Sequence, residues 1–337
     1  MKRLNSLFKS RKFLDIFCYV FCALYLVFVI AYAFNDIQIQ KDNERQLNNL
    51  VNSAVLVNKN LLDKKFYSPK KEETKTLPTE PLFNNGETAI LQAFKKLDKA
   101  NSFIVVMDGT TDIGKNIAGL GNFNLKLAMK NTSIKYNENK VYNENAVKKI
   151  GGSYPAVFES PIEQWVAYCS KSLRINETIA DYTAVGPVKL VNGEPVGDFK
   201  GIRKQDNVNK SLLADNMVIV NKETIEKIGF FKVKYKNDIP QYYYIQADLD
   251  AVKSAEKLRK IMNIDLGPFK FNPPTYLTTK LTVCLNAYGD LLSFRLISNV
   301  KEYLTTPLGS FEANCYLNVN FVISAIDKEI NFVPEGF

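Results

Sequence analysis

The sequence predicts an α+β fold: an N-terminal transmembrane helix, then a curved antiparallel sheet that wraps helices. Three observations lead to this prediction. Residues 16–34 carry no charge and directly follow a basic N-terminus. Runs of alternating apolar and polar side chains recur through the rest of the chain, and turn signals such as Asn192-Gly193 separate them. Hairpins that follow one another indicate an antiparallel sheet rather than a doubly wound one.

The apolar N-terminal run predicts a membrane anchor at residues 13–34. A helix of about 20 residues is about 30 Å long, which matches the hydrocarbon core of a bilayer. Residues 1–12 are basic and contain no acid, so we expect this tail to be cytoplasmic and the C-terminal domain to be extracytoplasmic. Ala31-Tyr32-Ala33 also fits a signal-peptide cleavage site, and cleavage after Ala33 is the alternative.

Two segments are expected between the anchor and the folded domain. Residues 35–62 predict a juxtamembrane stalk helix with one apolar seam, which either rests on the domain or forms a weak homodimer contact. The seam consists of Leu50, Ala54, Val57 and Leu61. Residues 63–83 are rich in Lys, Glu, Thr and Pro and predict a flexible linker. The extracytoplasmic α+β domain would then span residues 84–337.

The first elements of that domain follow from local patterns. Asn85-Gly86-Glu87 resembles a helix start, and apolar side chains then repeat at helical spacing up to Leu97. A strand is expected at residues 102–108, and we interpret the following Asp108-Gly109-Thr110-Thr111-Asp112 as a hairpin connection. The strand expected at residues 122–135 alternates cleanly between apolar and polar side chains.

The later elements are predicted mainly as hairpins. They are a hairpin over 188–196, strands at 230–235 and 241–248, strands at 276–286 and 291–303, and a last strand at 310–324. A second helix is expected at 249–262, because apolar side chains recur there at helical spacing. Apart from the hairpin over 188–196, residues 141–210 fit no element of this scheme.

The composition of the chain excludes several classes of function. The chain has no histidine, so Ser-His-Asp and Cys-His catalytic systems and histidine-ligated zinc sites cannot be built from it. We therefore expect no enzyme, no cofactor and no metal. Lysines are interspersed with acids, which argues against nucleic-acid binding. The bias toward Asn, Lys and Ile is typical of an AT-rich bacterial genome.

The order of elements resembles the LolA/LppX-type lipoprotein-carrier superfamily. The resemblance rests on the N-terminal membrane-targeting segment, a helix at 91–97 that leads into a strand, successive hairpins, the strand at 242–248 with its following helix, and the hairpin at 281–294. It implies a curved, incompletely closed antiparallel sheet that wraps helices and leaves an apolar cavity for acyl chains. The carriers are soluble or lipid-anchored, whereas this chain is expected to keep a transmembrane helix.

A membrane-tethered extracytoplasmic binding protein is the predicted function, holding a lipid acyl chain or another apolar ligand in a half-barrel cavity. The residues expected to line this cavity are Phe123, Leu125, Leu127, Tyr242, Tyr244, Leu281, Val283 and Leu285. The alternative is a cell-envelope scaffold or assembly protein that binds protein partners and has no ligand cavity.

Overall fold

The computed structural model describes residues 11–68, 76–117, 121–155, 167–175, 178–183, 188–192, 194–197, 203–205, 220–254, 275–306 and 309–334. The chain forms two compact units, Met1–Asn49 and Leu50–Phe337. In the first unit every described residue belongs to one helix, α2 (Arg11–Asp63), which continues into the second unit.

The part of α2 that was expected to be the anchor keeps its status as a prediction. Most side chains of residues 13–34 lie outside those that the structure describes. Among the described residues, no helix contains a stretch that is long and apolar enough to cross a membrane. The structure thus gives the predicted anchor no support.

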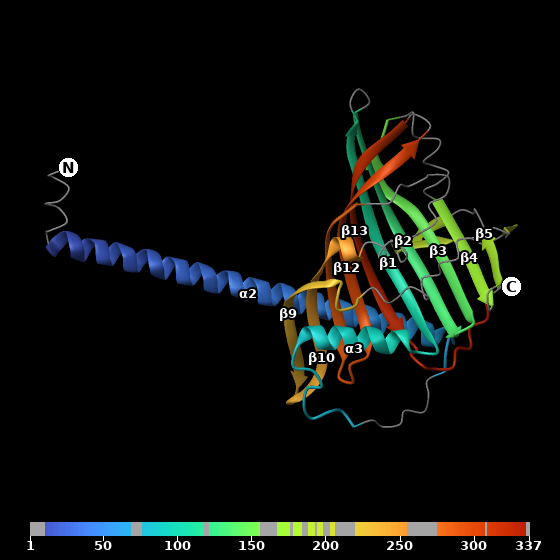
Figure 1. The fold of residues 1–337 in the computed structure, drawn as a ribbon, viewed down its shortest axis with the longest axis horizontal. Coiled ribbons are helices and arrows are strands. Elements are labelled where there is room, and N and C mark those ends of the chain that lie inside the picture. Colours follow the sequence, from blue (N-terminus) through green and yellow to red (C-terminus); the bar gives the residue numbers. More distant parts are fainter. Residues whose placement is uncertain are drawn as a thin grey trace. The chain divides into compact units, whose positions relative to one another are not determined.

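The second unit is built on a curved antiparallel sheet of eleven strands (Figure 1). The strand order is β8-β5-β4-β3-β2-β1-β13-β12-β11-β10-β9. Among the described strands, β8 and β9 therefore form the two edges, and these strands do not close into a barrel. The strands are β1 (Phe103–Ile117), β2 (Gly121–Asn137), β3 (Lys140–Ser153), β4 (Ala167–Ile175), β5 (Thr178–Thr183), β8 (Arg203–Gln205), β9 (Ile225–Lys236), β10 (Ile239–Leu249), β11 (Thr275–Asn286), β12 (Leu291–Thr306) and β13 (Gly309–Ser324).

One face of this sheet carries helix α3 (Gly86–Asp98), and we call it the inner face. Asn85 begins the helix as its N-cap, and its side chain accepts a hydrogen bond from the Thr88 backbone N–H at 2.8 Å. The buried side of α3 includes Ile90, Phe94 and Leu97. Because successive strand side chains point to opposite faces, Val105 of β1 belongs to the inner core and its neighbours lie on the other side.

The opposite, outer face is covered in two places. Leu61 of α2 belongs to a smaller apolar cluster that includes residues of β1, β2, β3 and β4, such as Ile104 and Ile134, and Val57 packs against it. A separate hairpin, β6 (Val188–Val191) and β7 (Glu194–Gly197), lies over β2, β3 and β4. The sheet therefore has apolar cores on both sides.

The seam predicted for the stalk helix is buried within this unit. Leu50, Ala54 and Leu61 are each at most 6% exposed, and Val57 packs against the outer-face cluster. The Ser293 hydroxyl donates a hydrogen bond to the Leu50 carbonyl at 3.1 Å. The seam thus rests on the sheet of its own chain, and a homodimer contact stays a prediction.

Several predicted elements differ from the structure. Asp108-Gly109-Thr110-Thr111-Asp112 is not a hairpin connection but the middle of β1, paired on both sides. Residues 251–254 of the predicted helix 249–262 are helical, whereas Leu249 ends β10 and residues 255–262 lie outside the described part. The predicted linker 63–83 is ordered near both ends: Tyr67 bridges to Ile330, and Phe83 is buried.

The hairpins were predicted well. Turns at Asn192, at Asn237-Asp238 and at Gly289 join β6 to β7, β9 to β10 and β11 to β12, and these residues have the positive φ angles that such turns require. The strands β2 and β13 confirm the runs predicted at 122–135 and 310–324, each slightly longer than expected.

Candidate functional site

The inner face presents apolar side chains in rows that cross the sheet. Strand register aligns Ile245 with Val283, Val283 with Phe294, Phe294 with Phe321, and Phe321 with Met107. All five belong to the main apolar core. A ligand on this face would therefore meet hydrocarbon over five neighbouring strands.

Helix α3 covers one end of this face. Its main strand contacts are with β9, β10 and β12. Phe94 of the helix lies 5.5 Å from Phe294 between ring centroids, and Phe294 stacks on Phe321 at 4.4 Å. At the start of the helix, a Cβ added to Gly86 would lie 2.9 Å from Ile245 Cγ2, so the helix sits directly on the sheet.

A second apolar region lies farther along the strands, beyond α3. We call it the distal lane, and it consists of Ile113, Phe123, Leu125, Leu127, Val300, Cys315 and Leu317. Cys315 is six residues along β13 from Phe321, a separation of about 20 Å in a strand. An α-helix with its side chains is only about 10–12 Å wide, and α3 crosses the strands near one end (Figure 1). The distal lane is thus not part of the packing under α3.

Hydroxyl groups interrupt the apolar surface at one level of the lane. The Thr279 and Ser298 hydroxyls lie 3.0 Å apart, and the Thr111 hydroxyl lies 2.9 Å from the Cys315 sulfur. All four side chains are at most 7% exposed. They satisfy one another, so they are compatible with an apolar environment.

The structure brings six of the eight predicted site residues onto the inner face. Phe123, Leu125 and Leu127 lie in the distal lane on β2. The other three, Leu281, Val283 and Leu285, lie on β11, four strands away or about 19 Å. Val283 pairs with Phe294, which contacts α3, so the β11 group lies nearer the helix than the β2 group does.

Tyr242 and Tyr244 are on the outer face instead, because Tyr243 pairs with inner-facing Leu285. Tyr243 is the inner-face tyrosine that the sequence prediction missed. Its hydroxyl accepts a hydrogen bond from the Leu82 backbone N–H at 2.7 Å, and its ring packs edge-on against Phe83. The signal that could have identified it is the alternation within β10, because Ile245, Ala247 and Leu249 follow Tyr243 at a spacing of two residues.

The outer face holds groups with shifted pKa values in two places, the buried surroundings of Tyr244 on β10 and the half-buried Asp108 on β1. Burial raises the pKa of the Tyr244 hydroxyl to about 12, and burial likewise raises the pKa of the Cys284 thiol to about 12. The pKa of Asp108 is raised chiefly by burial, although Asn320 hydrogen-bonds to its carboxylate. Within the described ranges no three His, Cys, Asp or Glu side chains lie close enough together to hold a metal ion.

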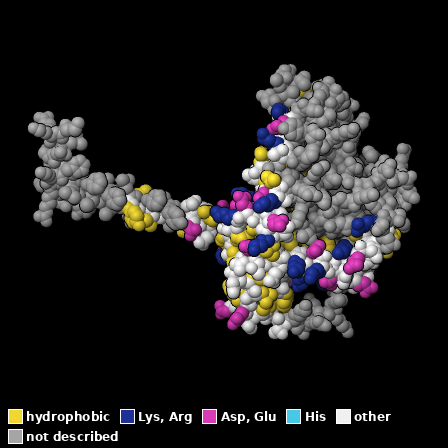
Figure 2. All heavy atoms as spheres, in the orientation of Figure 1, with side chains coloured by type: hydrophobic (Ala, Val, Ile, Leu, Met, Phe, Trp, Pro, Cys, Tyr) yellow, Lys and Arg dark blue, Asp and Glu magenta, His cyan; other side chains and the backbone are white. Residues whose placement is uncertain are grey.

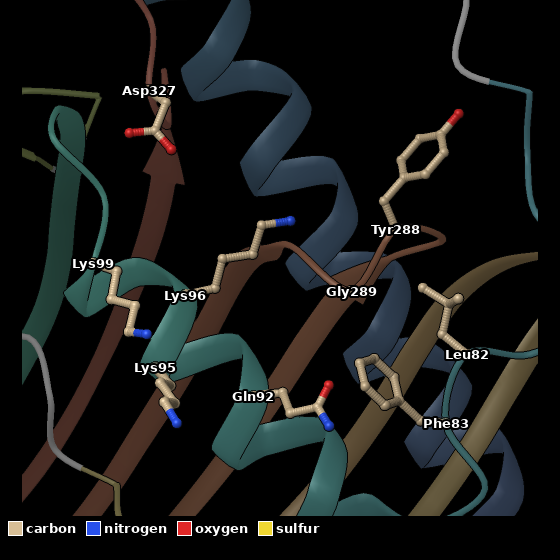
Figure 3. A pocket seen from close by; sticks show the side chains of 9 residues that line it. All are labelled: Leu82, Phe83, Gln92, Lys95, Lys96, Lys99, Tyr288, Gly289 and Asp327. Carbon is tan, nitrogen blue, oxygen red and sulfur yellow. The ribbon is translucent and has the colours of Figure 1, made fainter.

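A pocket of about 560 Å³ lies outside α3, between the helix and the Tyr288-Gly289 turn (Figure 3). Lys95, Lys96 and Lys99 line it together with Phe83. Lys96 forms an ion pair with Asp290, so part of the positive charge is compensated. Basic and acidic side chains are also interspersed over the described part of the face in Figure 2. The pocket is thus a mixed surface groove, separate from the inner face.

Comparison with known proteins gives likenesses in structure only. No protein-family model and no curated protein matches the sequence. Among solved structures, the chain is similar to lipovitellin, described for its lipid–protein interactions, with a TM-score of 0.27 and 10% identity over 70% of this chain and 26% of that one. The matched region is therefore about a quarter of the lipovitellin chain.

Two further similar structures carry names from the superfamily that the sequence resembles. An outer membrane lipoprotein-sorting protein domain from Vibrio parahaemolyticus gives a TM-score of 0.19 and 9% identity over 74% of this chain and 94% of that one. A LolA superfamily protein from Nitrosomonas europaea gives 0.17 and 10% identity over 72% and 94%. At TM-scores of this size the likenesses carry no argument about function, which rests on the sheet itself.

Proposed function

We propose that this protein binds an apolar ligand, such as a lipid acyl chain, in the distal lane of its inner sheet face. The observation that carries the proposal is the extent of that face. Apolar side chains recur along strands of 15 to 17 residues, interrupted at Thr111 on β1 and at Asn131 and Ser133 on β2. Such strands are about 50 Å long. Among the described residues, α3 spans only about a fifth of this length. The side chains of the distal lane are each at most 7% exposed.

The chemistry of the lane fits a hydrocarbon ligand. Its residues are aliphatic or aromatic apart from Cys315, and the hydroxyl groups beside it are already hydrogen-bonded. Burying one methylene group of an acyl chain on such a surface stabilises the complex by about 0.8 kcal/mol. A chain of a dozen methylenes would therefore be held without any charged contact.

We further propose that the binding domain is tethered to the cell membrane. The support is the uncharged run at residues 16–34 behind the basic tail at residues 1–12, which would place the domain outside the cytoplasm. A tethered domain cannot carry lipid across a wide gap. It would receive or hand over an acyl ligand at the membrane surface.

Photoaffinity labelling tests this function in the intact chain. Membranes that contain the full-length protein would be incubated with a fatty acid bearing a diazirine near its methyl end, then irradiated and digested. We expect mass spectrometry to locate adducts in β1, β2 and β13, at residues 111–113, 123–127 and 315–317. Adducts confined to residues 13–34, or no adducts, would overturn the proposal and favour a scaffold without a ligand cavity.

Two substitutions on β2 sharpen the test. Leu125→Phe adds volume inside the lane and should lower the labelling yield several-fold. Lys126→Ala alters the next residue, which points to the outer face, and should leave the yield unchanged. Equal yields in both variants would show that the probe reacts elsewhere.

A further inference from the structure

A group of uncharged polar side chains lies on the inner face beside the apolar rows. We call it the inner polar patch, and it consists of Asn131, Ser133, Asn143, Asn145 and Ser172. Register pairs Asn131 with Asn145, Ser133 with Asn143, and Asn143 with Ser172, so the patch spans β2, β3 and β4. Directly paired residues share a face, and Asn131 is also paired with inner-facing Met107.

Hydrogen bonds within the patch hold it together. The Asn143 carbonyl oxygen accepts from both the Asn131 amide, at 2.7 Å, and the Ser133 hydroxyl. The Asn131 amide also donates to Asn145, and its carbonyl accepts from Ser133 at 2.9 Å. Both amide hydrogens of Asn131 are thus engaged, the Ser133 hydroxyl hydrogen is shared between two carbonyl oxygens, and the orientation of the Asn143 amide is fixed.

Two groups of the patch have hydrogen-bonding capacity left over. Asn143 and Ser172 are each 8% exposed, so both are more than nine-tenths buried. Among the described residues, neither the Asn143 amide N–H groups nor the Ser172 hydroxyl has a hydrogen-bond partner, and neither is fully sealed from solvent. Buried polar groups nearly always have a partner, so these two point to a ligand or water that enters from the inner side.

The position of the patch links it to the distal lane. On β2, Met129 lies between Asn131 and Leu127, and on β3 Val147 lies beside Met129 in the same apolar core. Four residues separate Asn131 from Leu127, about 13 Å along a strand. An acyl chain in the lane could therefore place its polar end at the patch.

The patch itself carries no charge, which constrains the chemistry of that polar end. The nearest inner-face cations are already engaged: Lys135 donates to the Ala100 carbonyl at 2.9 Å, and Lys149 to the Tyr154 hydroxyl at 2.7 Å. Arg174, two residues from Ser172 on the same face, has an interaction of its own, and among the described residues its buried Nε makes no hydrogen bond. At the patch itself, a head group would thus meet amides and a hydroxyl, with the Arg174 guanidinium two residues farther along β4.

We infer that the inner polar patch binds the uncharged, hydrogen-bonding end of an acyl ligand, such as the hydroxyl or ester group of a glyceride. This inference rests on the proposed function, because it requires an acyl chain in the distal lane. The Ser172 hydroxyl and the Asn143 amide are the specificity-determining groups. Together they would donate to ester or hydroxyl oxygens that a plain hydrocarbon lacks.

Competition against a hydrocarbon probe separates two claims: that the distal lane binds an acyl chain, and that the inner polar patch binds its polar end. Full-length protein in membranes would be labelled with a diazirine-bearing alkane, and monoacylglycerol or fatty acid of equal chain length would compete. In Ser172→Ala, we expect the monoacylglycerol concentration for half-displacement to rise about three- to tenfold, as for one lost hydrogen bond. Labelling by the alkane alone should not change.

The control is Ser153→Ala, which removes an exposed hydroxyl at the end of β3 and should shift nothing. If monoacylglycerol displaces the probe equally well in Ser172→Ala and in the unaltered chain, the Ser172 hydroxyl does not bind the polar end of the ligand. If fatty acid displaces the probe better than monoacylglycerol does, and Ser172→Ala weakens displacement by fatty acid instead, the patch does not prefer an uncharged head group. If the alkane labels no inner-face residue at all, the proposed function fails first.

Discussion

Gly109 and Val319 face each other across the β1–β13 pair so closely that no side chain fits at residue 109. A Cβ added there would lie 2.4 Å from Val319 Cγ1 and 2.6 Å from the Asn318 carbonyl oxygen. Gly109 also pairs with Met129 of β2, so this close approach lies near the middle of the sheet. The glycine thus permits the strand packing from which the inner face is built.

Substitution of this glycine should destabilise the fold. Gly109→Ala must displace β13 backbone or Val319, and we expect a loss of about 1–3 kcal/mol in the free energy of unfolding. Gly114→Ala is the matched control on the same strand, because its Cβ would meet only Asn124 Nδ2 at 3.9 Å. Urea unfolding followed by far-UV circular dichroism would compare them, and equal stabilities would contradict the close packing at residue 109.

The same glycine explains why residues 108–112 were wrongly predicted to be a hairpin connection. Asp108-Gly109-Thr110-Thr111-Asp112 has the composition of a turn, yet it lies within β1. Glycine serves close approach rather than a bend at this point, and Asp108 lies on the outer face beside Asn320. Local composition cannot reveal a partner strand that is some two hundred residues away in the chain.

Asn58 of α2 should be a stabilising contact between the helix and the outer face. Its carbonyl oxygen accepts from the Ser324 hydroxyl at 2.6 Å and from the Tyr67 hydroxyl at 3.1 Å. Asn58→Ala leaves both buried hydroxyls without this acceptor, and we expect a loss of about 1–3 kcal/mol in unfolding free energy.

Asn60→Ala controls for the gain in helix propensity, because that side chain is exposed on the same helix. The difference between the two variants, measured by thermal unfolding, isolates the hydrogen bonds. If Asn58→Ala is as stable as Asn60→Ala, the contact contributes nothing measurable.

The N-cap of α3 gives a smaller, separable effect. Asn85→Ala removes the acceptor for the Thr88 N–H and should cost about 1 kcal/mol of unfolding free energy. Asn85→Asp keeps an acceptor oxygen and should restore most of that stability. Urea midpoints would measure both, and a destabilised aspartate variant would show that capping is not the role of residue 85.

The free energy of unfolding should fall at alkaline pH, because the buried Cys284 thiol and Tyr244 hydroxyl resist ionisation in the native state. The pKa values of Cys284 and Tyr244 rise to about 12 from ordinary values of 9.0 and 10.0. The native state therefore holds these protons more tightly than the unfolded state, and their contribution is complete below pH 9 and lost as the pH rises toward 12.

We expect the urea midpoint to decline above about pH 9, and Cys284→Ala to weaken that decline. The Cys284 thiol should also resist thiol reagents at pH 8 until the protein unfolds. Rapid labelling of Cys284 in the native protein at pH 8 would contradict its burial.

The predictable parts of the fold were those with a local signature. The alternation in β2 and the turn residues of the β9–β10 and β11–β12 hairpins identified their strands, and Asn85 marked the start of α3. The inner face was harder, because Tyr242, Tyr243 and Tyr244 are alike. Only the alternation that follows them places Tyr243 on the apolar face of Ile245, Ala247 and Leu249. The inner polar patch had no signal, since its members become neighbours only through register.

The central claim, an acyl ligand on the inner face, is tested most directly by native mass spectrometry. The full-length protein would be extracted from bacterial membranes, released from detergent in the instrument, and compared with an organic extract of the same sample. We predict one lipid-sized adduct per chain, sharply reduced in Leu125→Phe. A bare chain with no enriched lipid in the extract would contradict the account.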